Sequence, residues 1–403
     1  MIADFSLLSF RFLTLAVMAV VLLTLLGGKA RQTAFLAVNL IFLNYVLLGP
    51  SGTLSTLLFC LLGYLLVRSL SASSGWGFVA VLATYVLVFT YMRNYDFLNW
   101  ILPDTWQTQI LATAGLSFMF FKIVHVMIEV RSATAPPVDF PSFLNYCLNF
   151  TSFAMGPIQR YQDYRAQWLG EKPAIAPTFE AHLDALLRIL VGLVKAYVLA
   201  RFFAPFTIPV GSGLAGLSVT QLLIGGYAFY AFLYLSFSGY CDVVIGVGSL
   251  MGVRPPENFD KPFLARNVSD FWLRVHRSLT LWLTDYVFTP LYKRMLSSTA
   301  FRTRPLLAAN ISVMVTMMVS GLWHGTTLSF FLFGVIHGLY LVIYRLWDAS
   351  LLRILGRARL GELRKHPLAI FAGMFVTFNA VSFAYLFFHL DSVKAIRDIM
   401  GAM

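Results

Sequence analysis

Residues 306–344 read L-L-A-A-N-I-S-V-M-V-T-M-M-V-S-G-L-W-H-G-T-T-L-S-F-F-L-F-G-V-I-H-G-L-Y-L-V-I-Y, a stretch of 39 residues without Asp, Glu, Lys or Arg. A helix that spans a membrane needs about 20 predominantly apolar residues. We therefore predict two membrane-spanning helices here. The stretch also contains His324 and His337, and an ionisable side chain in an apolar span is a hypothesis for a functional site because its desolvation must be offset.

Similar apolar runs occupy nearly the whole chain of 403 residues, in which apolar types make up 59% and charged types 12%. This composition excludes a disordered chain, a coiled coil and a soluble nucleic-acid-binding protein. We predict an all-α, polytopic integral membrane protein with about 10–12 helices, some of them re-entrant. The further runs are Phe5–Gly28, Thr33–Gly49, Gly52–Val67, Trp76–Met92, Gln109–Val130, Phe143–Gln159, Leu183–Pro209, Leu214–Val253 and Pro367–His389. The run 214–253 is long enough for two spans. The run 143–159 is short and broken by Gly-Pro, and we predict it to be re-entrant.

The net charge is +12, and the basic residues concentrate in two loops. Residues 254–304 hold nine Lys and Arg against four Asp and Glu, and residues 345–365 hold six against two. Basic loops favour the cytoplasmic side, so we predict both loops to be cytoplasmic and both termini extracytoplasmic. The three cysteines show no metal-binding or disulfide spacing, and we predict no metal site.

The basic segment 254–304 contains an aromatic, amphipathic pattern that begins near Asn267. Ser269 is a plausible N-cap, and Trp272 and His276 fall on one face of the predicted helix, which Pro290 would end. We interpret it as a helix at or below the membrane interface. His276 is then either an interfacial residue or a second polar group that faces the same cavity as His324.

His324 is flanked by Gly321 and Gly325, which permit close approach of backbone or substrate. A buried, neutral imidazole can accept a proton from a hydroxyl group, but a hydrogen-bonded histidine between helices fits equally well. For His337 and His125 a structural role is favoured, the latter in a local network with Lys122 and Glu129.

Two more clusters stand out. Ser238 and Asp242 lie in a glycine-punctuated apolar run, where Asp242 must find a partner. Asn258 follows two prolines at the end of that run. Nucleophile elbows, P-loops and zinc-protease motifs do not occur in the sequence.

Four ordered motifs resemble the membrane-bound O-acyltransferase family: F-S-G-Y-C-D-V-V-I-G at 237–246, R-P-P-E-N-F-D-K-P-F at 254–263, D-F-W-L-R-V-H-R at 270–277 and G-L-W-H-G-T-T at 321–327. Upstream, G-L-S-F-M-F-F-K at 115–122, M-G-P-I-Q-R-Y-Q-D-Y at 155–164 and L-V-G-L-V-K-A at 190–196 are similar to its bacterial branch. The resemblance covers roughly residues 110–345.

The resemblance implies tilted helices around a central tunnel, with His324 as the catalytic histidine and His276 as the second functional position. Many relatives have Asn at the latter position, and residues 273–275 also depart from the family pattern. We divide the chain into N-terminal membrane helices (1–110), a core (111–347) and a C-terminal basic loop with the last membrane helix (348–403). The expected substrate-binding or tunnel residues are Trp323, Trp272, Asn258, Asp242, Ser238, Asp285 and Tyr286.

The family resemblance implies an enzyme of the bacterial cytoplasmic membrane that moves an acetyl or D-alanyl group from a cytoplasmic thioester to an extracytoplasmic hydroxyl. The donor would be acetyl-CoA or an acyl carrier protein, with no tightly bound cofactor. The acceptor would be a cell-wall or exopolysaccharide glycan or a partner acyltransferase, and membrane lipids surround the protein. Two bacterial branches stay open, alginate and peptidoglycan O-acetylation and teichoic-acid D-alanylation. A proton-coupled transporter and a non-catalytic membrane anchor are the alternative functions.

Overall fold

The computed structural model describes residues 8–70, 75–95, 98, 115–168, 178–208 and 217–389, in which every regular element is a helix. The all-α prediction is therefore confirmed. The chain divides into two compact units, and each is described by itself: unit 1 comprises Ala3–Leu199 and Leu235–Glu257, and unit 2 comprises Ala200–Tyr234 and Asn258–Met403. The starts of the predicted runs Phe5–Gly28 and Gln109–Val130, and residues 390–403, lie outside the described residues.

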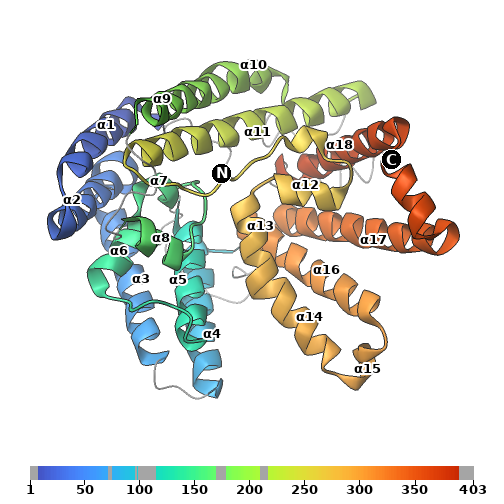
Figure 1. Ribbon diagram of the computed structural model, residues 1–403, viewed down its shortest axis with the longest axis horizontal. Coiled ribbons are helices and arrows are strands. Elements are labelled where there is room, and N and C mark those ends of the chain that lie inside the picture. The colour runs from blue at the N-terminus through green and yellow to red at the C-terminus, as the bar shows by residue number, and fades with distance from the viewer. Residues whose placement is uncertain are drawn as a thin grey trace. The chain divides into compact units, whose positions relative to one another are not determined.

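Unit 1 holds the N-terminal helices and the second half of the long helix α11 (Figure 1). Side-chain caps begin several of them: Ser9 accepts a hydrogen bond from the Phe12 amide, and Asp139 accepts one from the Ser142 amide. The elements are α1 (Phe10–Leu25), α2 (Gly28–Ile41), the π-helix η2 (Phe42–Leu48), α3 (Gly49–Ser69), α4 (Gly75–Arg93), α5 (Leu116–Arg131), α6 (Phe140–Leu148), α7 (Phe150–Phe153), α8 (Tyr161–Trp168), α9 (Phe179–Val194), the π-helix η6 (Lys195–Leu199) and residues 235–250 of α11 (Val219–Leu250).

Unit 2 holds the first half of α11 and the C-terminal helices, of which α16 and α17 pack along each other. Its elements are α10 (Ala200–Phe203), the 3-10 helix η7 (Ala204–Phe206), residues 219–234 of α11, the 3-10 helix η8 (Pro262–Leu264), α12 (Val268–Arg274), α13 (Arg277–Leu283), the π-helix η9 (Thr284–Phe288), α14 (Thr289–Leu296), α15 (Thr299–Arg302), α16 (Pro305–His324), α17 (Leu328–Leu363) and α18 (Pro367–His389).

Six helical segments in the described residues are long and apolar enough to cross a membrane. Large apolar side chains on their surfaces are exposed, as shown by Trp76 at 85% and Leu368 at 72%. In water such exposure would be unfavourable, whereas lipid is as apolar as these side chains. The polytopic membrane class is thereby confirmed. The candidate spans are Gly28–Ser69, Gly75–Arg93, Val219–Leu250, Pro305–His324, Leu328–Leu363 and Pro367–Phe387.

The run 143–159, predicted to be short and broken, is interrupted in the structure. Asn149 separates α6 from α7, and its side chain accepts hydrogen bonds from the Thr151 amide and hydroxyl. Non-helical backbone follows α7 up to Arg160, and most of it is buried. Irregular backbone at membrane depth is tolerated where protein groups satisfy it. Here the Phe150 amide donates to Asn39, and the Tyr161 amide donates to His125.

Two sequence-based predictions of helix boundaries are wrong. The run 214–253 contains one helix of 32 residues, α11, instead of two spans, because its glycines keep helical backbone and pack against neighbouring segments. The amphipathic helix expected from Ser269 to Pro290 begins instead after the Asn267 cap and breaks at His276. Pro290 does not end the helix, because it lies two residues after the π-helix η9 within continuous helical backbone from Arg277 to Leu296.

Candidate active site

His324 is the last residue of α16 in unit 2, at the turn between the two helices predicted from residues 306–344. The helix ends there because Gly325 takes an extended conformation (φ −164°, ψ 175°). The imidazole is half-buried. Its ring centroid lies 4.6 Å from that of Trp323 and 5.7 Å from that of Phe333 on α17. The ring is therefore held among aromatic side chains and still reaches the protein surface.

Glycines bring α17 directly against the end of α16. A Cβ atom on Gly321 would overlap the Phe330 carbonyl oxygen, and one on Gly334 would overlap the Met317 carbonyl oxygen. A Cβ atom on Gly338, four residues after Gly334, would lie 2.6 Å from the Met314 sulfur. Small residues four apart are the usual means by which membrane helices approach closely. This contact fixes the position of His324 relative to α17.

His276 lies at the break between α12 and α13, and its ring centroid is 6.4 Å from that of His324 and 5.3 Å from that of Trp323. The structure thus brings together the two histidines that the sequence singled out. His276 lies outside the candidate spans, it is 4% exposed, and burial lowers its pKa from 6.5 to about 3. Its imidazole is therefore neutral at physiological pH.

Trp272 lies on α12, four residues before His276. Its indole N–H donates to Nδ1 of His337 at 3.3 Å, and both side chains are buried. The Phe333 ring centroid is 4.5 Å from that of His337 and 5.7 Å from that of His324. Sequence reasoning missed Phe333, although its i, i+4 spacing to His337 beside two glycines is a helix-packing signal. The hydrogen bond fits the structural role favoured for His337.

Asn258 is fully buried, and its Oδ1 accepts hydrogen bonds from the amide (3.2 Å) and the hydroxyl (2.8 Å) of Ser278. Asp285 and Tyr286 lie on η9, where Asp285 is exposed and the half-buried Tyr286 packs on Trp282 at 5.1 Å. Of the expected tunnel residues in unit 2, Trp323 contacts both histidines and Asn258 contacts the first turn of α13.

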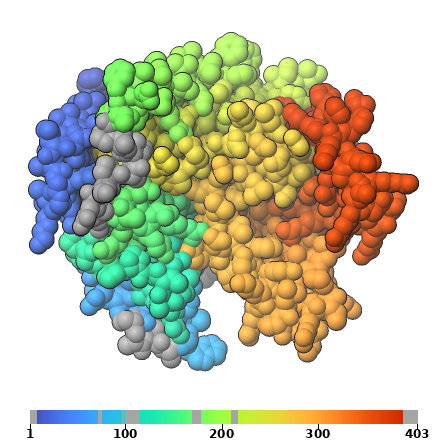
Figure 2. All heavy atoms as spheres, in the orientation of Figure 1, coloured from blue at the N-terminus to red at the C-terminus, as the bar shows by residue number. Residues whose placement is uncertain are grey.

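The helical run from Arg277 to Leu296 is about 30 Å long at 1.5 Å per residue, and its η9 and α14 parts pack along α16. His276 precedes one end of the run. The exposed basic residues Lys293, Arg294, Arg302 and Arg304 lie toward the other end. They belong to residues 289–304, here called the α14–α15 segment, at the surface of unit 2 (orange in Figure 2).

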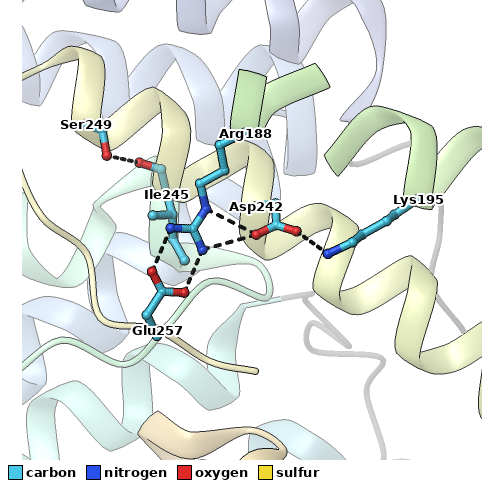
Figure 3. A network of polar contacts seen from close by, with 6 residues as sticks. All are labelled: Arg188, Lys195, Asp242, Ile245, Ser249 and Glu257. Atoms are coloured by element: carbon cyan, nitrogen blue, oxygen red, sulfur yellow. Dashed lines mark hydrogen bonds and ion pairs between the residues drawn. The ribbon is translucent and has the colours of Figure 1, made fainter. Parts of the chain in front are cut away.

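Ser238 and Asp242 belong to unit 1, where Asp242 lies between two cations (Figure 3). Arg188 Nε is 3.1 Å from one Asp242 oxygen and Lys195 Nζ is 2.7 Å from the other. Arg188 also makes two hydrogen bonds with Glu257, at 2.6 and 2.5 Å. The partner that the sequence required for Asp242 is therefore present, and the four charges balance.

Close packing of α9 and η6 on α11 builds this network. A Cβ on Gly192 would lie 2.6 Å from the Gly239 carbonyl oxygen, and one on Gly239 would meet Gly192 equally closely. Arg188 and Lys195 flank Gly192 along their helices, so both cations reach Asp242. The Ser238 hydroxyl is buried and has no hydrogen-bond partner among the described residues. Within those residues, no group of three or more His, Cys, Asp or Glu side chains could hold a metal ion.

The family model described as "MBOAT, membrane-bound O-acyltransferase family" matches residues 40–354. A teichoic acid D-alanyltransferase of Streptococcus thermophilus is 30% identical over 288 residues, which cover 69% of this chain and 68% of that protein. The Bacillus subtilis teichoic acid D-alanyltransferase is 25% identical, with 80% and 83% covered. A probable alginate O-acetylase of Azotobacter vinelandii is 31% identical, with 59% of this chain but only 45% of that protein covered.

Proposed function

The chain belongs to the membrane-bound O-acyltransferase family, and from this premise we propose that it moves an acyl group from a cytoplasmic thioester to a hydroxyl group outside the membrane. It is an O-acyltransferase and a multi-pass membrane protein. The observation that carries the proposal is the half-buried His324 ring, 6.4 Å from the neutral His276 ring. The setting we propose is a bacterial cytoplasmic membrane.

In the proposed reaction, His324 accepts the proton of the acceptor hydroxyl as that oxygen bonds to the thioester carbonyl carbon. The carbon–sulfur bond then breaks, an ester forms, and the leaving thiolate takes the proton back from the imidazolium. General-base catalysis of this kind contributes about 10²–10⁴-fold. We assign donor positioning to His276 and to Trp323, whose ring contacts both histidines, because Trp272 directs its N–H to His337.

The proposed donor is coenzyme A or a phosphopantetheinyl carrier protein. Both are anionic, which suits the exposed basic residues of the α14–α15 segment. Teichoic acid D-alanyltransferases match over more of their own length, 68% and 83%, than the alginate O-acetylase at 45%. We therefore favour D-alanyl transfer to a cell-wall polymer, with acetyl transfer to a glycan as the second candidate.

Purified protein in lipid nanodiscs tests the proposal. Radiolabelled D-alanyl carrier protein with lipoteichoic acid forms one arm, and radiolabelled acetyl-CoA with alginate forms the other. We expect label in the polymer of the first arm, together with release of one thiol per ester formed. Label in the second arm alone would assign acetyl transfer. No label in either polymer, with both donors intact, would contradict the proposal.

A further inference from the structure

His276 has a backbone conformation that side-chain-bearing residues rarely adopt, with φ 45° and ψ 45°. Left-handed backbone at a non-glycine residue is costly and persists only where the surrounding structure fixes it. His276 also occupies the N-cap position of α13, but its side chain makes no capping hydrogen bond. The ring instead faces Trp323 and His324. Another residue must therefore satisfy the first amides of α13 and hold the break.

Asn258 satisfies those amides from outside the helix. Its carbonyl oxygen accepts from the Arg277 amide at 3.0 Å, and its Oδ1 accepts from the Ser278 amide and hydroxyl. An N-cap side chain normally accepts such bonds within its own helix. Asn258 thus makes the capping bonds that His276 does not make, and it does so on the C-terminal side of His276.

The N-terminal side of His276 is held by the same segment. The Asp260 amide donates to the Arg274 carbonyl oxygen at 2.8 Å, and Arg274 makes an ion pair with Asp270 at 2.8 Å. Residues 258–260 therefore bond to the chain on both sides of the histidine. Because both flanks are fixed, the direction of the His276 ring depends on this segment.

We propose that Asn258 is a positioning residue that sets the His276 ring against Trp323 and His324, instead of a residue that contacts substrate. The inference rests on the proposed function, because it assumes that His276 acts on the donor. Asn258 is 0% exposed, and its Oδ1 is already bonded to Ser278. A buried side chain whose acceptor oxygen is already bonded is suited to act through His276 and not on the substrate directly.

The test uses the full-length protein in nanodiscs and radiolabelled D-alanyl carrier protein, or acetyl-CoA where that is the working donor. In Asn258→Ala we expect kcat to fall by about 10–100-fold with donor KM within about threefold, because misplacing a catalytic group mainly slows the chemical step. Asn258→Asp keeps the acceptor oxygens and should recover part of the loss. The matched control is Asn267→Ala, which removes an equivalent cap from α12 and should lower the melting temperature similarly with kcat within about twofold.

A double-mutant cycle decides whether Asn258 acts through His276. In a His276→Ala background, Asn258→Ala should cause no further loss, because the ring that it positions is gone. Additive losses, or an Asn258→Ala protein as active as the parent, would overturn the inference, as would full activity in His276→Ala. If Asn258→Ala does not fold, Ser278→Ala replaces it in the double-mutant cycle, because this change removes only the hydrogen bond from the Ser278 hydroxyl to Asn258. An active His324→Ala protein would refute the proposed function separately.

Discussion

Asp242 in unit 1 and His324 in unit 2 attract attention in the sequence for the same reason, since each is an ionisable residue in an apolar run. The structure gives them opposite surroundings. Asp242 lies between Arg188 and Lys195, and its charge is compensated. His324 lies among aromatic rings beside a second, neutral histidine held in strained backbone. Removing one partner of such an ion pair would leave a charge uncompensated, which gives the pair a role in packing, whereas an imidazole that reaches the protein surface can exchange protons with a substrate.

The largest expected effect separates these two residues directly. His324→Ala should lower acyl transfer by about 10²–10⁴-fold, which is the contribution of general-base catalysis, with little change in melting temperature. The measurement is label transfer to the polymer by a variant that elutes as the parent protein does. His366→Ala, which changes an exposed histidine, is the control and should remain active. A folded, fully active His324→Ala protein would show that His324 is not the general base.

The next largest effect tests the packing that places His324. Gly334→Leu should force α17 away from α16, because even a Cβ at this position overlaps the Met317 carbonyl. We expect about 1–3 kcal/mol of lost stability and at least a tenfold loss of activity in the protein that still folds. Gly361→Ala on the same helix is the control, because its Cβ would meet no atom within 4 Å. Equal activity of the two variants would show that the glycine contact does not position the histidine.

Asp242→Asn tests whether the compensated charge in unit 1 has a structural role. Removing the anion leaves Arg188 and Lys195 facing each other, and we expect a loss of about 1–3 kcal/mol, less than for a fully buried pair because both cations are partly exposed. Asp348→Asn, in the exposed pair with Arg364, should cost about 0–1 kcal/mol. Thermal unfolding of both variants measures the difference. A large loss of kcat in Asp242→Asn at unchanged melting temperature would place Asp242 in the catalytic machinery.

The last prediction concerns the neutral state of His276, whose effect is spread over a range of pH. Its folded pKa is about 3 and the usual value is 6.5, so between these values the unfolded chain binds a proton that the folded protein does not. Stability is therefore lost as the pH falls below 6.5, by up to about 1.4 kcal/mol per pH unit for this group. The melting temperature of His276→Gln should depend less on pH between 6.5 and 5.0 than that of the parent. Identical slopes would mean that His276 is not buried as a neutral ring.

The sequence alone predicted the all-α membrane class, the two spans of residues 306–344 and the break near Gly156. These follow from local properties, namely the length of apolar runs and the backbone limits of Gly and Pro. The same reasoning named both histidines of the candidate site. It also predicted that Asp242 needs a partner, because an isolated charge in an apolar run is unfavourable wherever the run packs.

Only the tertiary structure decided which residues meet. The helical pattern of 269–290 gave no sign of the break at His276. That break depends on hydrogen bonds to Asn258, more than 15 residues away in the sequence, which stabilise a backbone conformation that local propensity opposes. Likewise, periodicity placed Trp272 beside His276, but the indole donates to His337 on another helix. Partners of this kind depend on contacts distant in sequence, on which local pattern carries no information.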